Sequence, residues 1–220
     1  MKSLLVLLAI CAISSADVSG PSGLLLKSLL FPENSDNGYV IIQPKKPMKL
    51  SAWTLCMKLL TDSQSTMSIF SYATTAHQNQ ILVEMANDRL KVHLADQRVD
   101  YRVPVGLVGW TPVCVTWDSA TGRTVVWVNG TRTMNKISSQ GKGVVAEGSV
   151  ILGQDQDTVG GGFDKKQRYV GELTDVNMWD TVLQPCEMPV RSHNARGNVI
   201  DWTTVQYEIK GNVIIIDLTE

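Results

Sequence analysis

The stretch that decides the fold runs from Pro112 to Gly130 and reads PVCVTWDSATGRTVVWVNG. It holds two runs rich in β-branched and aromatic residues, PVCVTW and TVVWV, and it ends in Asn-Gly ahead of TRTM. Runs of this composition are typical of strands. Asn-Gly between strands is a strong hairpin signal, because both residues tolerate positive φ. The stretch therefore predicts two strands and a tight hairpin turn at Asn129 and Gly130.

The same pattern recurs along most of the chain, with turn residues at short intervals. The further segments of this kind are GYVIIQ, WTLCMKL, SIFSYAT, ILVEM, RLKVHL, VDYRV, SVILG, RYVGELTDVNMW, VQYEIKG and VIIID. Long stretches with apolar residues at i, i+3 and i+4 are missing, and the one helix candidate runs from Pro185 to Ser192. Many short strands with regular turns predict an all-β fold, a two-sheet antiparallel sandwich or jelly roll with one short helix.

Composition indicates an ordinary globular protein with one substantial core. The chain has 220 residues, of which 44% are hydrophobic and 19% charged, and its formal net charge is -1. All-β sandwiches of this length are commonly single domains. The near-zero charge, without a basic stripe, gives no electrostatic basis for binding nucleic acid or an anionic membrane.

The N-terminus has the pattern of a secretory signal peptide. Lys2 is followed by an apolar run from Leu4 to Ile13 and then by small residues. The run is too short to cross a bilayer, which needs about 20 residues. We expect cleavage after Ala16, with Gly20 as the second choice. The signal then covers residues 1–16, the mature domain covers 17–220, and the product is secreted.

Three cysteines remain after the signal leaves with Cys11. In an oxidising compartment disulfides form and persist. Cys56 and Cys114 both lie in strand-like segments, and we expect them to form a bridge between strands. Cys186, in LQPCEMP, is then the odd cysteine, either free or linked to another chain.

Asn129 is also part of an N-x-T glycosylation acceptor, Asn129-Gly130-Thr131. An exposed turn of a secreted protein is where such a site is modified. Because a tight turn can hinder the transferase, two outcomes stay open, a glycan on Asn129 and an unmodified hairpin turn.

Oxygen-bearing side chains concentrate in residues 151–167, ILGQDQDTVGGGFDKKQ, where an apolar strand end meets a glycine-rich loop. Calcium takes six to eight oxygen ligands from carboxylates, amides, backbone carbonyls and water. An EF-hand does not fit, because the fifth and twelfth positions counted from Asp155 are Val159 and Lys166. Composition alone leaves a cation site and a solvated loop equally open. The oxygen donors are Asp155, the backbone of Gln156, Asp157, Asp164 and Gln167.

Signals for catalysis are weak. The chain has no G-x-S-x-G and no H-E-x-x-H motif, and its only histidines are His77, His93 and His193. Spaced His/Cys clusters for zinc are missing. The carboxylates outside the loop are scattered and offer no pair for a glycosidase. Trp117, Trp127 and Trp179 alternate with apolar partners, which favours core packing over sugar stacking.

Several segments together resemble the short secreted pentraxins. The family signature is H-x-C-x-[ST]-W-x-[ST], and residues 112–119, PVCVTWDS, match it at Cys114, Thr116, Trp117 and Ser119. The departure is Pro112, where the family has His. SIFSYAT, SVILGQDQD, VNMWD and VQYEIKG also look like the family and follow its order. The resemblance covers nearly all of the chain after the signal.

The resemblance implies a two-sheet, lectin-type jelly roll with Cys56–Cys114 as the family's disulfide. It also implies a cyclic homo-oligomer, usually a pentamer, whose ligand face carries two Ca²⁺ ions per subunit. The family's acidic loop falls on Asp155, Gln156 (through its carbonyl), Asp157, Asp164 and Gln167. An Asp-Asn pair that also binds calcium in the family corresponds to Gln78 and Asn79, so we expect a weakened first ion.

The ligand pocket departs from the family pattern at two positions. Glu84 stands where an apolar wall is expected, and Arg98 stands near the position of an acidic residue. These charges are reversed from those that suit phosphocholine. We therefore expect Glu84 and Arg98 to contact another phosphorylated or anionic saccharide.

The opposite face of the ring is where family members dock the complement protein C1q. A glycan on Asn129 would stand in that region and could obstruct a C1q-like partner.

The sequence thus predicts a secreted, calcium-dependent pattern-recognition lectin of innate immunity and the acute phase, without enzymatic activity. Two alternatives stay open. One is a laminin-G-like adhesion module with structural calcium, and the other is a glycoside hydrolase on a related sandwich.

Overall fold

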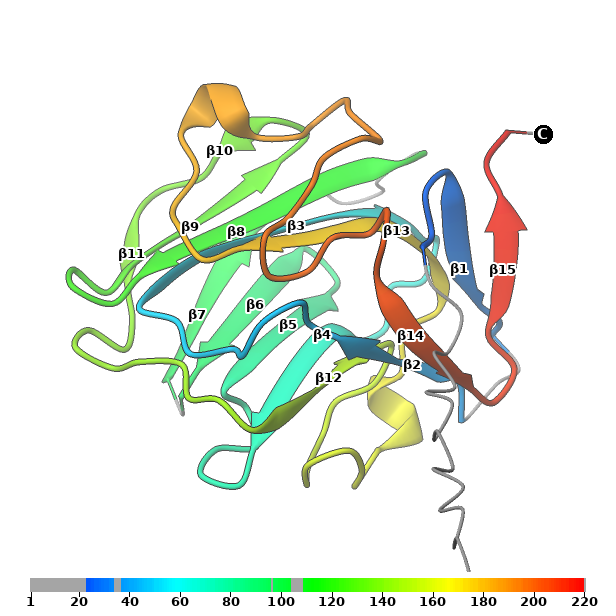
Figure 1. Ribbon diagram of the computed structural model, residues 1–220, viewed down its shortest axis with the longest axis horizontal. Coiled ribbons are helices and arrows are strands. Elements are labelled where there is room, and N and C mark those ends of the chain that lie inside the picture. Colours follow the sequence, from blue (N-terminus) through cyan, green and yellow to red (C-terminus); the bar gives the residue numbers. More distant parts are fainter. Residues whose placement is uncertain (1–22, 34–36, 96, 104–108, 220) are drawn as a thin grey trace, which may run out of the picture.

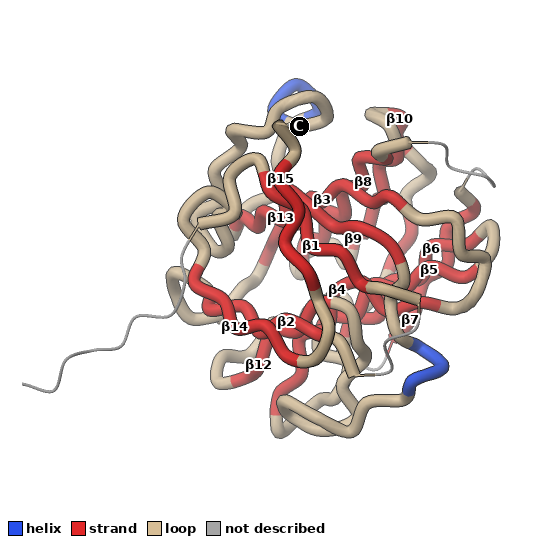
Figure 2. The backbone as a smooth tube through the Cα atoms, turned by 90° about the vertical axis from the view of Figure 1, so that its right-hand side faces the viewer, coloured by secondary structure: helices blue, strands red, loops and turns tan. Residues whose placement is uncertain are grey.

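The computed structural model describes residues 23–33, 37–95, 97–103 and 109–219. The predicted signal peptide and both cleavage positions lie outside them. Two antiparallel sheets stack face to face (Figure 1), as the strand pattern predicts. Two single 3₁₀ turns lie on opposite sides of this sandwich in Figures 1 and 2.

The larger sheet has eight strands. In spatial order they are β10 (Thr131–Arg132), β9 (Arg123–Val128), β8 (Thr111–Asp118), β3 (Ala52–Leu60), β13 (Gly171–Trp179), β1 (Lys27–Phe31) and β15 (Ile214–Asp217), with the short β11 (Lys136–Ile137) also on β9. The expected hairpin turn joins β9 to β10, and Asn129 and Gly130 there have φ of 50° and 76°. Strand β1 was not among the strands predicted from the sequence.

The smaller sheet has seven strands and carries the candidate site. Their order is β14 (Gln206–Lys210), β2 (Tyr39–Gln43), β12 (Gly148–Leu152), β4 (Met67–Thr74), β5 (Ile81–Ala86), β6 (Arg89–Leu94) and β7 (Gln97–Arg102). Side chains alternate across the sheet. On β5, Ile81 and Val83 enter the core, so Leu82 and Glu84 belong to the outer face.

The apolar core lies between the sheets and buries three tryptophans completely. Trp53 and Trp117 face each other with ring centroids 6.3 Å apart, and Trp202 joins them in the core. The indole N–H of Trp117 donates to the carbonyl of Ser138 at 3.0 Å, which satisfies its one polar atom. Core packing is therefore confirmed for Trp117. Trp127 and Trp179 are only partly buried and pack elsewhere, around the disulfide.

The disulfide joins Cys56 and Cys114, which lie directly opposite each other on β3 and β8. Both side chains alternate with core residues, so the bridge lies on the outer face of the larger sheet. Met188 packs against it, together with Trp127, Trp179, Leu183 and Val190. The predicted pairing is confirmed, and Cys186 is free and exposed.

The helix expected from Pro185 to Ser192 is wrong in extent. Only Pro185–Glu187 (η2) is helical, as a single 3₁₀ turn. Pro189 explains the early end, because a residue before proline is pushed out of the helical region. Met188 accordingly has φ −64° and ψ 123°. A second 3₁₀ turn, Lys165–Gln167 (η1), was not predicted.

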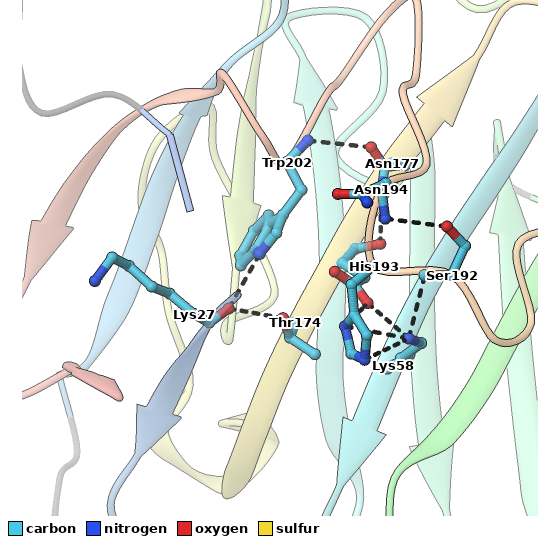
Figure 3. A network of polar contacts seen from close by, with 9 residues as sticks. Lys27, Lys58, Thr174, Asn177, Ser192, His193, Asn194 and Trp202 are labelled. Carbon is cyan, nitrogen blue, oxygen red and sulfur yellow. Dashed lines mark hydrogen bonds and ion pairs between the residues drawn. The ribbon is translucent and has the colours of Figure 1, made fainter. Parts of the chain in front are cut away.

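A buried ion network ties the segment 180–198 to the outer face of the larger sheet (Figure 3). Lys58 Nζ lies 2.8 Å from Asp175 Oδ2, and His193 Nδ1 lies 2.8 Å from the same oxygen. Lys58 also donates to the carbonyl of Ser192 at 3.2 Å. Asp175 and Lys58 are each 5% exposed. A buried carboxylate on this face is therefore matched by a cation.

Removing the disulfide should destabilise the protein without changing its sheets. Replacing Cys56 and Cys114 together by Ala opens a cross-link between residues 58 positions apart, which costs about 2–5 kcal/mol of unfolding free energy. Chemical denaturation measures this loss. Cys186→Ser is the control and should leave stability unchanged, because the thiol is exposed. A double variant as stable as the wild type would contradict the structural role of the bridge.

Acid should weaken the contact between residues 44–47 and 199–204. Burial alone would raise the pKa of Asp201, but hydrogen bonds from Lys45 and Thr203 outweigh it and hold the pKa below its usual range. A carboxyl with a depressed pKa stabilises the fold at neutral pH, and this contribution is lost as pH falls through the folded-state pKa. Asp201→Asn should cost about 1–3 kcal/mol at pH 7 and progressively less in acid.

Thermal melts between pH 7 and pH 3 test this, with Asp217→Asn as the matched control. Asp217 pairs with Lys27 at an exposed position and should contribute less than 1 kcal/mol. Equal losses of stability for Asp201→Asn and Asp217→Asn at pH 7 would contradict the stabilising role assigned to the Asp201 carboxylate.

Candidate functional site

Residues 153–170 form a loop between β12 and β13, and its part around Gln156 lies against the outer face of the smaller sheet. The side chain of Gln156 holds it there and is completely buried. Its Nε2 contacts the carbonyls of Ser71 and Ser149, both at 3.0 Å, and its Oε1 accepts from the Gly160 N–H at 2.8 Å. Because these contacts engage the side-chain amide, the backbone carbonyl is the oxygen of Gln156 that we assign to a metal ion.

Asp155 is the buried carboxylate of the loop, at 5% exposure. Gln167 Nε2 donates to its Oδ2 at 3.2 Å. Its Oδ1 is buried and has no hydrogen-bond partner in the described part of the chain. Burial, followed by the negative charges of Glu84 and Asp157, raises the pKa of Asp155 to about 6. Within the described residues Asp155 has no ion-pair partner, unlike Asp175 on the other face, which pairs with Lys58.

The remaining predicted ligands are less closely gathered. Asp157 is exposed and near enough to Asp155 to influence it electrostatically. Asp164 is exposed and caps η1, since its Oδ1 accepts from the Lys166 N–H at 2.9 Å. Asn79 lies in the turn between β4 and β5, and its Oδ1 is buried with no hydrogen-bond partner among the described residues. Gln78, beside it, is exposed.

The donor set fits a hard cation. Within the described residues, no group of three or more His, Cys, Asp or Glu side chains lies close enough together to hold a metal ion. The candidate ligands here instead combine carboxylate, amide and backbone carbonyl oxygens, which is the mixture that calcium accepts. The unpartnered oxygens of Asp155 and Asn79 are what such an ion would satisfy.

The structure adds to this part of the sheet a residue, His93, to which the sequence analysis gave no role in the site. His93 Nε2 lies 2.7 Å from Glu84 Oε2, joining β6 to β5 diagonally. Burial raises the pKa of Glu84, but the bond and charge of His93, with Lys91 and Arg98 nearby, outweigh it and lower that pKa. Arg98 lies opposite His93 and pairs with Asp100 at 2.9 Å. The short turn between the segments ILVEM and RLKVHL could have predicted that they pair as a hairpin, which places His93 near Glu84.

Comparison with known proteins agrees with the fold. A sequence model described as the Pentaxin family matches residues 27–217. C-reactive protein of Danio rerio is 33% identical over 220 residues, covering 96% of this chain and 98% of the relative. A mucosal pentraxin of Mus musculus is 37% identical over 190 residues, covering 86% of each chain.

The same family appears among solved structures. The native heptameric SAP-like pentraxin from Limulus polyphemus superposes with a TM-score of 0.78 at 27% identity, over 87% of this chain and 95% of that chain. The chain belongs to the pentraxin family. Its members are pattern-recognition proteins of the acute-phase type rather than enzymes, and they bind calcium. Homologues such as C-reactive protein are secreted. In the described residues, no helix is long and apolar enough to span a membrane.

The uncompensated charge of Asp155 gives a test of the metal site. In EDTA at pH 7.5, Asp155→Asn should be at least as stable as the wild type, because it removes a buried charge that Glu84 and Asp157 repel. In calcium the order should reverse, because the wild type gains binding energy that the variant lacks. Thermal melts with and without calcium measure both differences. A variant less stable in EDTA and equally stabilised by calcium would contradict this reading of Asp155.

Proposed function

We propose that the chain is a secreted, calcium-dependent pattern-recognition lectin that binds phosphorylated or anionic saccharides on microbial or damaged-cell surfaces. Family membership supports the recognition role. The observation that carries the calcium step is Asp155 Oδ1, a buried carboxylate oxygen without a hydrogen-bond partner in the described residues. The protein has no catalytic step in this proposal.

Two Ca²⁺ ions per subunit would share the oxygens of the loop and of the β4–β5 turn. The residues assigned to them are Asn79, Asp155, Gln156 through its carbonyl, Asp157, Asp164 and Gln167, with Gln78 as a weak neutral ligand. Calcium takes six to eight oxygens, so this set leaves coordination positions open. Phosphate or carboxylate oxygens of the ligand fill those positions.

The surroundings of the site support a polar ligand. Recognition of a choline headgroup uses aromatic or apolar surface around the quaternary ammonium. Here the outer face of β5–β7 carries Glu84, His93 and Arg98 instead. These groups can hydrogen-bond sugar hydroxyls while calcium holds the anionic group. A phosphorylated or anionic saccharide therefore suits the pocket better than phosphocholine does.

Assembly into a ring would supply the strength that one site lacks. The Limulus relative is heptameric, and we infer a cyclic homo-oligomer here, by analogy with the pentamers usual in the family. Several sites on one plane raise avidity on a repetitive surface by about 10²–10⁴. Exposed Cys186 offers a further link between chains.

The opposite face is proposed to receive a C1q-like protein. Asn129 is exposed there at the β9–β10 turn, and an ideal Cβ on Gly130 would lie 3.5 Å from Val190 of the segment 180–198. A glycan on Asn129 would stand over this segment and hinder docking.

Retention on a resin bearing a phosphorylated saccharide tests the proposed function. The wild type should bind in calcium and elute with EDTA. Asp157→Ala should lose most retention, because it removes a carboxylate of the site. Asp217→Ala, an exposed substitution on the other sheet, should bind as the wild type does.

Two results would contradict the proposal in different ways. Retention that resists EDTA would favour a laminin-G-like adhesion module with structural calcium. Release of free sugar from the resin would favour a glycoside hydrolase.

A further inference from the structure

Glu84 is a buried carboxylate on a face of the sheet where charged residues normally meet water. It is 5% exposed, although it alternates with the core residues Val83 and Met85 on β5. Lys, Glu, Arg and Asp are almost never this buried unless they are paired or bind an ion. His93 engages one carboxylate oxygen, Oε2, at 2.7 Å.

The sheet register places Glu84 beside the calcium loop. Gln156, the neighbour of Asp155, contacts Ser71 Oγ at 3.1 Å on β4. Ser71 lies directly opposite Leu82, and Glu84 is the next residue of β5 on the same face. Adjacent strands lie about 4.8 Å apart, and residues i and i+2 about 7 Å apart. A glutamate side chain spans such a distance, and the repulsion between Glu84 and Asp155 agrees with this placement.

Two buried oxygens in this part of the site have no hydrogen-bond partner within the described residues. Ser68 lies directly opposite it on β4 and is completely buried, and its Oγ has no hydrogen-bond partner in the described residues. Asp155 Oδ1 is in the same condition. Like carboxylates placed together repel each other unless a cation lies between them. The hydrogen bond from His93 is the kind of support that orients a metal-binding carboxylate.

We propose that Glu84 supplies a carboxylate to the calcium centre, from the rigid sheet rather than from a loop. It thereby replaces the negative charge that the neutral Gln78 does not provide. The inference rests on the calcium-dependent function proposed above. His93 is a positioning residue in this arrangement, because it holds Glu84 and does not touch the ion.

The proposal also assigns a consequence to the ligand pocket. A glutamate held by calcium on one side and by His93 on the other presents little free negative charge to a ligand. Anionic ligands can then approach Arg98, which is half exposed on β7 beside His93. Glu84 thus strengthens the metal site and also leaves the pocket tolerant of anionic ligands.

Isothermal titration with calcium chloride tests the assignment on the full-length secreted protein. Glu84→Gln should weaken binding of the affected ion about tenfold or more, because losing a carboxylate or its orientation costs this much in metal sites. Glu208→Gln, on an exposed position of the same sheet, is the matched control and should titrate as the wild type does. Adding Gln78→Asp to the Glu84→Gln variant should restore much of the affinity.

The outcomes separate this inference from the proposed function. A wild type that binds calcium, with Glu84→Gln binding equally well, overturns the role of Glu84 and leaves the lectin proposal standing. A wild type that binds no calcium overturns both. If circular dichroism in EDTA shows that Glu84→Gln is unfolded, Glu84→Asp takes its place. It keeps the charge one methylene further back, and calcium affinity equal to the wild type would then overturn the inference.

Discussion

The candidate site depends on one buried side chain, Gln156. Its side-chain Nε2 donates to Ser71 and Ser149 and so fastens the loop 153–170 to β4 and β12, and its side-chain Oε1 accepts from the N–H of Gly160 further along the loop. Each contact satisfies a polar group in a place that water does not reach. Asp155 is held at the sheet surface as a consequence, and so is its unpartnered oxygen. Without this anchor the loop would be a solvated turn, the alternative that composition alone left open.

The two outer faces of the sandwich differ in whether a buried carboxylate is paired with a cation. On the larger sheet, Asp175 is compensated by Lys58 at 2.8 Å, and the pair ties down a neighbouring segment. On the smaller sheet, Asp155 has an equal exposure of 5% but forms no ion pair within the described residues, where Gln167 donates a hydrogen bond to it. An uncompensated buried carboxylate costs several kcal/mol unless it is neutralised. A bound cation is the neutralising partner that the donor set suits.

Much of the fold could be predicted because alternation and turn chemistry act locally. The Asn129–Gly130 hairpin and the disulfide of Cys56 with Cys114 follow from strand patterns. The short helix could not be delimited, since Pro189 ends it through a local steric effect that competes with the favourable start at Pro185. Strand β1 was missed because KSLLF lacks a clear alternation, and its pairing with β13 and β15 is a long-range contact.

The site was predicted less completely than the fold. The loop residues Asp155, Gln156, Asp157 and Gln167 were named from the sequence, and the structure brings them together. The cap that Asp164 makes for η1 and the bond between His93 and Glu84 depend on loop geometry and register, which composition does not reveal. That Asn79 binds the same calcium ion as these loop residues remains a prediction.

The central claim is that this loop is a calcium site. The most direct measurement is an isothermal titration of the wild-type protein with calcium after treatment with EDTA. The account predicts saturable binding in or below the millimolar range, with two ions per subunit. Absence of binding up to millimolar calcium would contradict it.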